Sequence, residues 1–151
     1  NMTLDRVLVL EHLGRIQELK MKVRGRTEQG VEYHFARSID EAYTLMEQGP
    51  IIRALVNPAL CGIRKKDDLS VYPAGIELMK ELTRSGTSVL YSEPRFEDDT
   101  LVKSEVCVAL VPGPFDSNDI SNIMGFMESG NLGNHEDTWY RPSGFPRYFE
   151  E

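Results

Sequence analysis

Five short apolar runs, separated by stretches with helical spacing, constrain the fold of this chain more than any other feature. The runs span residues 6–10, 31–35, 51–56, 87–91 and 106–111. Most of them are nearly continuous in Val, Leu, Ile and Ala, which is typical of strands covered on both faces of a parallel sheet. The run at 31–35 alternates apolar and polar residues, so we expect that strand to be less buried and to lie at an edge of the sheet.

The stretches between the runs carry apolar residues at the spacing of amphipathic helices. We expect helices over residues 13–23, 38–48, 74–84, 97–104 and 116–129. Ser38 and Glu41 have the spacing of a capping box, and Asp116 and Asp119 crowd the start of the last helix. Strands that alternate with helices predict an α/β fold with a parallel sheet and helices on both faces.

The chain has 151 residues, of which 40% are hydrophobic, and this fits one domain with a substantial core. We expect residues 1–130 to form that domain and residues 131–151 to form an irregular, aromatic-rich tail. The formal charge of −7 opposes non-specific binding to nucleic acid or to anionic membranes. No stretch approaches the roughly eighteen apolar residues that a membrane helix needs. We therefore expect a protein partner rather than nucleic acid or a membrane.

The two cysteines, Cys61 and Cys107, are too few for a disulfide scaffold. This favours a reducing, cytoplasmic setting. Cys107 lies inside an apolar run, where a buried thiol is common, and nothing around Cys61 in the sequence indicates a reactive thiolate.

Polar or small residues follow the predicted strands, at the sheet edge where α/β domains hold their ligands. These residues are Glu11 and His12, Asn57, Ser92 and Gly113. We expect Asn57 to hydrogen-bond the turn that follows it. Ser92 lacks the G-x-S-x-G context of a nucleophile, and His12 lacks the clustered ligands of a zinc site. The strand ends therefore predict no catalytic residue, no metal and no cofactor.

Several segments together resemble a response-regulator receiver domain over about residues 5–129. The matching segments are RVLVLEH, ARSIDEAYTLME, IRALVNPALCG, GIELMKELT, VLYSEP and PGPFD. The resemblance implies a flavodoxin-like, doubly wound α/β fold with a five-stranded parallel sheet of order 2-1-3-4-5 and helices on both faces.

The resemblance also implies roles for the strand-end residues. In receivers, an acidic pair holds magnesium, an aspartate accepts the phosphoryl group, a Ser or Thr reports it and a lysine neutralises it. In this sequence those positions are, in the same order, Glu11 and His12, Asn57, Ser92 and Gly113. The neutral amide of Asn57 cannot form an acyl phosphate, and a single acid is a poor set of ligands for Mg²⁺. The resemblance thus implies a vestigial phosphoacceptor pocket.

Two segments depart from the receiver pattern. The connection from Asn57 to Gly75 is longer, and its extra residues, about 64–72, overhang the same end of the sheet, where they either cover the pocket or form a partner surface. The aromatic switch position of receivers falls on Leu110.

Aromatic residues of the tail, together with Leu110, are the candidate contact residues. They are Trp139, Tyr140, Phe145, Tyr148 and Phe149. Aromatic side chains dominate the energetics of many interfaces, and exposed clusters of them rarely stay uncovered. The tail therefore either folds back on the domain or contacts a partner, which includes a second copy of the chain.

We expect a non-phosphorylatable, receiver-like signalling or regulatory module that acts through protein–protein contacts and is not an enzyme. An alternative from another class is a flavodoxin-like domain that binds or converts a small molecule in the cleft at the strand ends. A third is a receiver whose output domain lies on another chain, with residues 100–110 carrying specificity. The sequence does not identify the partner or the oligomeric state.

Overall fold

A five-stranded parallel sheet forms the centre of the molecule, as the sequence predicts. The computed structural model describes residues 4–24, 30–65, 71–93, 106–132 and 139. The sheet consists of β1 (Asp5–Leu10), β2 (Val31–Ala36), β3 (Arg53–Val56), β6 (Ser88–Ser92) and β7 (Ala109–Val111). Its order is β2-β1-β3-β6-β7, which is the predicted order 2-1-3-4-5 of the strands in this sheet. The edge position of β2 is confirmed.

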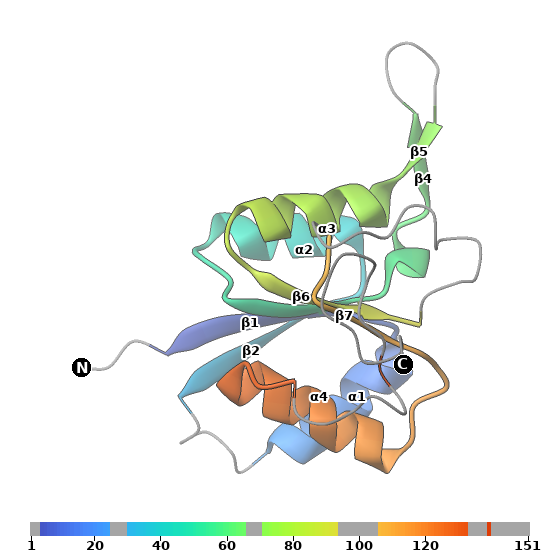
Figure 1. Cartoon of the computed structure of the whole chain (residues 1–151). Helices are drawn as coiled ribbons and strands as arrows, with labels where there is room; N and C mark the ends of the chain where they lie inside the picture. The colour runs from blue at the N-terminus through green and yellow to red at the C-terminus, as the bar shows by residue number, and fades with distance from the viewer. Residues whose placement is uncertain (1–3, 25–29, 66–70, 94–105, 133–138, 140–151) are drawn as a thin grey trace, which may run out of the picture.

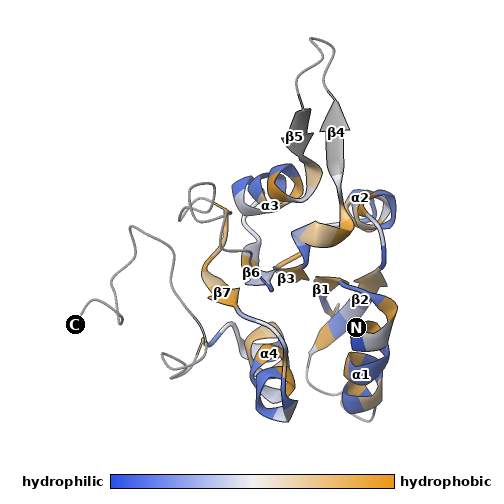
Figure 2. Cartoon of the chain, turned by 90° about the vertical axis from the view of Figure 1, so that its right-hand side faces the viewer, coloured by the Kyte–Doolittle hydropathy of each residue, from blue (hydrophilic) through white to orange (hydrophobic). Residues whose placement is uncertain are grey.

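In the described part of the chain, helices cover both faces of this sheet (Figure 1). They are α1 (Leu13–Val23) and α4 (Ser117–Ser129) on one face, and α2 (Ile39–Glu47) and α3 (Ala74–Arg84) on the other. Alternate residues of a strand point to opposite faces, so Val7 and Val9 join the core under α1 and α4, whereas Leu8 and Leu10 join the core under α2 and α3. The buried apolar residues form one cluster on each side of the sheet, and Figure 2 shows the helices that carry them as alternating apolar and polar ribbon.

Side-chain caps begin the helices close to the predicted residues. The Ser38 hydroxyl accepts a hydrogen bond from the Glu41 amide at 3.2 Å. The Glu41 carboxylate reaches back to the amide of Arg37, at 2.8 Å, rather than to that of Ser38, so the predicted capping box is displaced by one residue. Asp116 and Asp119 form a complete capping box at the start of α4.

A small antiparallel hairpin interrupts the predicted polar segment between β3 and α3. A 3₁₀ turn, η2 (Pro58–Leu60), leads into β4 (Ile63–Lys65), which pairs with β5 (Val71–Pro73). The sequence did not predict these strands. They rise past α2 and α3, away from the sheet, rather than across its strand ends (Figures 1 and 2). The tip, residues 66–70, lies outside the described residues.

The strand bounds differ slightly from the predicted ones, and two predicted segments fall largely outside the described residues. β7 begins at Ala109 rather than at Val106. Val106 and Cys107 are buried, as predicted for this run, but they belong to no strand. The helix expected at 97–104 lies in the undescribed part of the chain, as does most of the tail. No helix among the described residues is long and apolar enough to cross a membrane.

Trp139 is one of the described residues of the tail, and it is only 3% exposed. It belongs to the same buried cluster as Val9, Leu19 and Met124, which come from β1, α1 and α4. The tail therefore packs on the domain at this residue.

Candidate functional site

The carboxyl ends of β1, β3 and β6 bring together three of the residues predicted for the site. Glu11, Asn57 and Ser92 follow or end these strands, and all three are at most 5% exposed. Neighbouring parallel strands present their carboxyl ends at one edge of the sheet, which is why residues far apart in the sequence meet here. Figure 2 looks onto this edge.

The Glu11 carboxylate is completely buried and accepts four hydrogen bonds. Its Oε1 accepts from the His12 amide at 3.2 Å and from Nδ2 of Asn57 at 3.1 Å. Its Oε2 accepts from the Ser92 hydroxyl and from Nη1 of Arg15, the latter at 3.1 Å. A buried carboxylate is stable only when it is paired and hydrogen-bonded, and these four donors meet that need.

The Asn57 side chain is held at both of its polar atoms. Its Oδ1 accepts from the Ala59 amide at 3.2 Å and so caps η2, which confirms the predicted contact with the following turn. Its Nδ2 donates to Glu11 and also to Oε2 of Glu93, at 3.3 Å. This orientation of the amide is set by the hydrogen-bond network. The amide thus presents only N–H donors to the two carboxylates.

Two charged residues of the site were missed from the sequence, namely Arg15 and Glu93. Arg15 projects from the first turn of α1, is 6% exposed, and places Nη1 2.5 Å from Oε2 of Glu93. Glu93 directly follows Ser92 and has a φ of 52°, a left-handed conformation that costs free energy for a residue other than glycine. The i, i+4 spacing of Glu11 and Arg15 and the position of Glu93 after β6 were the available sequence signals.

Gly113 lies against Glu93, at the position to which the receiver resemblance assigns a lysine. A Cβ atom on Gly113 would stand 2.5 Å from Oε1 and 2.6 Å from Cγ of Glu93. The carboxylate of Glu93 therefore occupies the space that a side chain at this position needs.

His12 is exposed and caps α1, with its Nδ1 accepting from the Arg15 amide at 3.3 Å. Ligand atoms of Glu11, His12 and Glu93 lie within 4.8 Å of one another. However, Nη1 of Arg15 already contacts both carboxylates. A magnesium ion needs near-ideal octahedral oxygen coordination, and a guanidinium at the same carboxylates prevents it. With Arg15 in place, these residues do not fit a divalent cation.

The other candidate residues lie elsewhere. Leu110 and Trp139 are buried, at 8% and 3% exposure. The remaining tail aromatics are outside the described residues: Tyr140, Phe145, Tyr148 and Phe149. Burial raises the pKa of the Cys107 thiol to about 12, against a smaller opposing effect of a backbone hydrogen bond from Ala109, so this thiol is unreactive.

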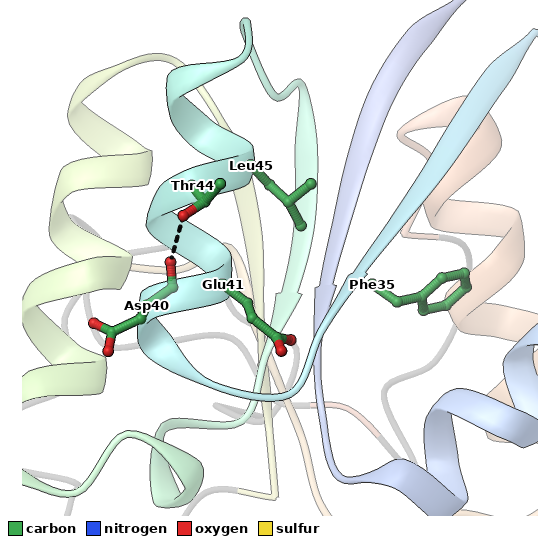
Figure 3. Close-up of a pocket in the computed structure, with 5 residues that line it drawn as sticks. All are labelled: Phe35, Asp40, Glu41, Thr44 and Leu45. Atoms are coloured by element: carbon green, nitrogen blue, oxygen red, sulfur yellow. Dashed lines mark hydrogen bonds between the residues drawn. The ribbon is translucent and has the colours of Figure 1, made fainter.

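A shallow groove of about 340 Å³ lies beside α2 and the edge strand β2 (Figure 3). Its lining residues are Phe35, Asp40, Glu41, Thr44 and Leu45. None of them was predicted for the site, and the Glu41 carboxylate is engaged in capping α2. The groove is thus separate from the strand-end residues.

No protein-family model and no curated protein sequence matches the chain. Solved structures of response regulators do match in fold. A response regulator protein from Burkholderia pseudomallei, with a phosphorylated aspartic acid, calcium ion and citrate, is 15% identical, with a TM-score of 0.56 over 83% of this chain and 68% of that one. A response regulator from Thermotoga maritima is 17% identical, with a TM-score of 0.54 over 84% and 100%.

A response regulator receiver domain protein (CheY-like) from Methanospirillum hungatei JF-1 is 18% identical, with a TM-score of 0.57 over 83% of this chain and 94% of that one. These likenesses agree with the strand order and with the two helical layers. The chain has the flavodoxin-like fold of a response-regulator receiver domain.

Proposed function

We propose that the chain is a receiver-like signalling or regulatory module that accepts no phosphoryl group and acts through contacts with a protein partner. The observation that carries this proposal is that position 57 holds an amide whose hydrogen bonds are already made. Its amide stands where the resemblance places the phosphoacceptor, and its N–H groups donate to Glu11 and Glu93.

The chemistry of this edge opposes phosphoryl transfer in two ways. Covalent acceptance needs a nucleophile such as a carboxylate, and an amide is not one. A phosphoryl group also needs cations that stabilise its oxygens, whereas Glu11 and Glu93 supply negative charge and Arg15 is already paired with both of them. Gly113 supplies no cation, and the Glu93 side chain occupies the space beside it.

The receiver fold supports a signalling role, and a module that accepts no phosphoryl group, as proposed, would signal by binding. We further propose a cytoplasmic location and a partner that is a protein.

Incubation with acetyl phosphate and Mg²⁺ tests the proposal. We expect intact mass spectrometry to find no phosphoryl adduct on the wild-type chain. The Asn57→Asp variant should also stay unlabelled or label very slowly, because Arg15, Glu93 and Gly113 are unchanged. Binding of a partner captured from the native organism should be the same with and without acetyl phosphate.

The Burkholderia pseudomallei response regulator, whose structure holds a phosphorylated aspartic acid, is a suitable positive control. Labelling of the wild-type chain at this edge would overturn the proposal. Rapid labelling of Asn57→Asp alone would show that the counter-charge or the metal ligands have been assigned to the wrong residues.

A further inference from the structure

We propose that Arg15 is the built-in cation of this sheet edge. Its guanidinium takes the place that a divalent cation would need among the carboxylates, and it holds the edge in one arrangement without metal or phosphoryl group. This inference rests on the proposed function and concerns the control of the same site. Arg15 acts through Glu11 and Glu93, and is therefore a positioning residue.

Arg15 bridges two carboxylates through a single nitrogen. Nη1 lies 3.1 Å from Oε2 of Glu11 and 2.5 Å from Oε2 of Glu93. The Arg15 and Glu11 side chains are 8% and 0% exposed, so water screens this pair poorly. One nitrogen of α1 thereby joins the end of β1 to the end of β6.

The contact with Phe115 extends this bridge to a third connection. The guanidinium carbon of Arg15 lies 3.6 Å from the centroid of the Phe115 ring, a close cation–π arrangement. Phe115 lies between β7 and α4. Because a flat guanidinium can pair with carboxylates and stack on a ring at the same time, arginine suits this place better than lysine.

The charge balance explains why a cation is needed here. Two carboxylates face each other, and Nη1 of Arg15 contacts both of them. Without this guanidinium, two like charges would be left close together, one of them fully buried, which is strongly unfavourable. Glu11, Glu93 and the nearby His12 would then offer three ligand atoms within 4.8 Å of one another. Oxygen-rich sites of this kind suit Mg²⁺ and Mn²⁺.

In the wild-type chain, a divalent cation would first have to displace the guanidinium. That would break both carboxylate contacts and remove Arg15 from the Phe115 ring. The wild-type protein should therefore be insensitive to divalent cations, and the loss of the Arg15 charge should create sensitivity. Arg15→Met removes the charge and keeps much of the volume, whereas Arg15→Lys keeps the charge.

The test is a titration with Mn²⁺, followed by the electron paramagnetic resonance of the free ion, with Mg²⁺ as competitor. We expect Arg15→Met to bind Mn²⁺ at least about tenfold more tightly than the wild type and Arg15→Lys. The added mutation Glu93→Gln should abolish this gain. Lys22→Ala removes an exposed positive charge from the same helix, so it controls for net charge and should behave as the wild type.

A folded Arg15→Met variant that gains no affinity would overturn the proposal, as would wild-type binding of Mn²⁺ that Glu93→Gln abolishes. If Arg15→Met does not fold, circular dichroism of the Arg15→Met, Glu93→Gln double variant decides the matter, because the second change removes one of the two facing carboxylates. A folded double variant supports the need for a positive charge between the carboxylates, and an unfolded one contradicts it. The phosphorylation assay remains independent, because it reads covalent labelling at Asn57.

Discussion

The side chain of Glu93 restricts which residue can stand at position 113, which lies beside it in space. Its backbone is left-handed, at a φ of 52°, and its carboxylate accepts from Arg15 and Asn57. In this position it fills the space beside Gly113. The glycine and the strained glutamate therefore depend on each other, and neither can be changed alone without loss.

We expect Gly113→Ala to lower the free energy of unfolding by about 1–3 kcal/mol, the usual cost of overpacking. The added Cβ would stand 2.6 Å from Cγ of Glu93, and Glu93 cannot move without losing its bonds to Arg15 and Asn57. Urea unfolding measures the change.

Glu93→Ala in the Gly113→Ala background separates this clash from other causes. The two changes together should cost less than the sum of the single changes, because the second removes the obstructing side chain. Strict additivity would show that the strain at Gly113 comes from another contact.

The residues of the site differ in how well the sequence predicts them. Glu11, Asn57 and Ser92 are predictable, because they stand at the ends of buried strands and parallel strands end at one edge. Arg15 is not predictable in this way. The rotation of α1 about its axis decides whether the side chain at that position points toward the carboxyl edge of the sheet or into solvent. Glu93 is not predictable for a similar reason. The direction of its side chain follows from a left-handed backbone conformation that glutamate seldom adopts.

Among the elements, the contact between η2 and the start of α3 keeps the Asn57 turn in place. The backbone of α3 at Gly75 lies so close to Pro58 that a Cβ would stand 2.5 Å from its Cα. Pro58 follows Asn57, whose Oδ1 caps the same turn. The helix thereby supports the turn that aims the Asn57 amide at the carboxylates.

We expect Gly75→Ala to lower the free energy of unfolding by about 2–3 kcal/mol, because backbone rather than a flexible side chain must shift. Gly125→Ala is the matched control, since Gly125 is also helical and a Cβ there meets nothing within 4 Å. That control should stabilise the chain by about 0.5–1 kcal/mol. Equal effects of the two changes in urea unfolding would contradict the close approach of α3 to η2.

The elements were predicted to the extent that their apolar pattern is regular. Continuous runs identified the sheet strands, and alternation identified β2 as the edge strand. The β4–β5 hairpin was not predicted, because Ile63–Lys65 and Val71–Pro73 are too short and too mixed to show a period. The two segments pair with each other in antiparallel register, which short mixed sequences do not reveal.

At the scale of the whole molecule, Trp139 of the tail joins the core on the side of α1 and α4. Trp139 is the only tryptophan of the chain, and it is buried in the cluster that also holds Val9 and Phe126. The change in composition near residue 130 therefore does not keep this ring out of the core. A partner cannot contact it without unpacking the tail.

We expect Trp139→Ala to lower the free energy of unfolding by about 3–5 kcal/mol, because a large ring leaves the core. Trp139→Phe, which keeps an aromatic ring, should lose clearly less. In the wild type, iodide should quench the tryptophan fluorescence poorly until urea unfolds the chain. Strong quenching of the folded protein would place the ring at the surface and return it to the candidates for a partner contact.

The bridge from Arg15 to Glu11 and Glu93 has a consequence for how the module depends on the ionic content of its surroundings. A bound ion is in exchange with a pool, so its occupancy rises and falls with supply. A cation that is covalently part of the chain has a fixed effective concentration at its partners. With Arg15 in that role, neither a chelator nor an excess of salts of divalent metals alters the strand ends, and the surface offered to a partner stays the same when the supply of magnesium changes.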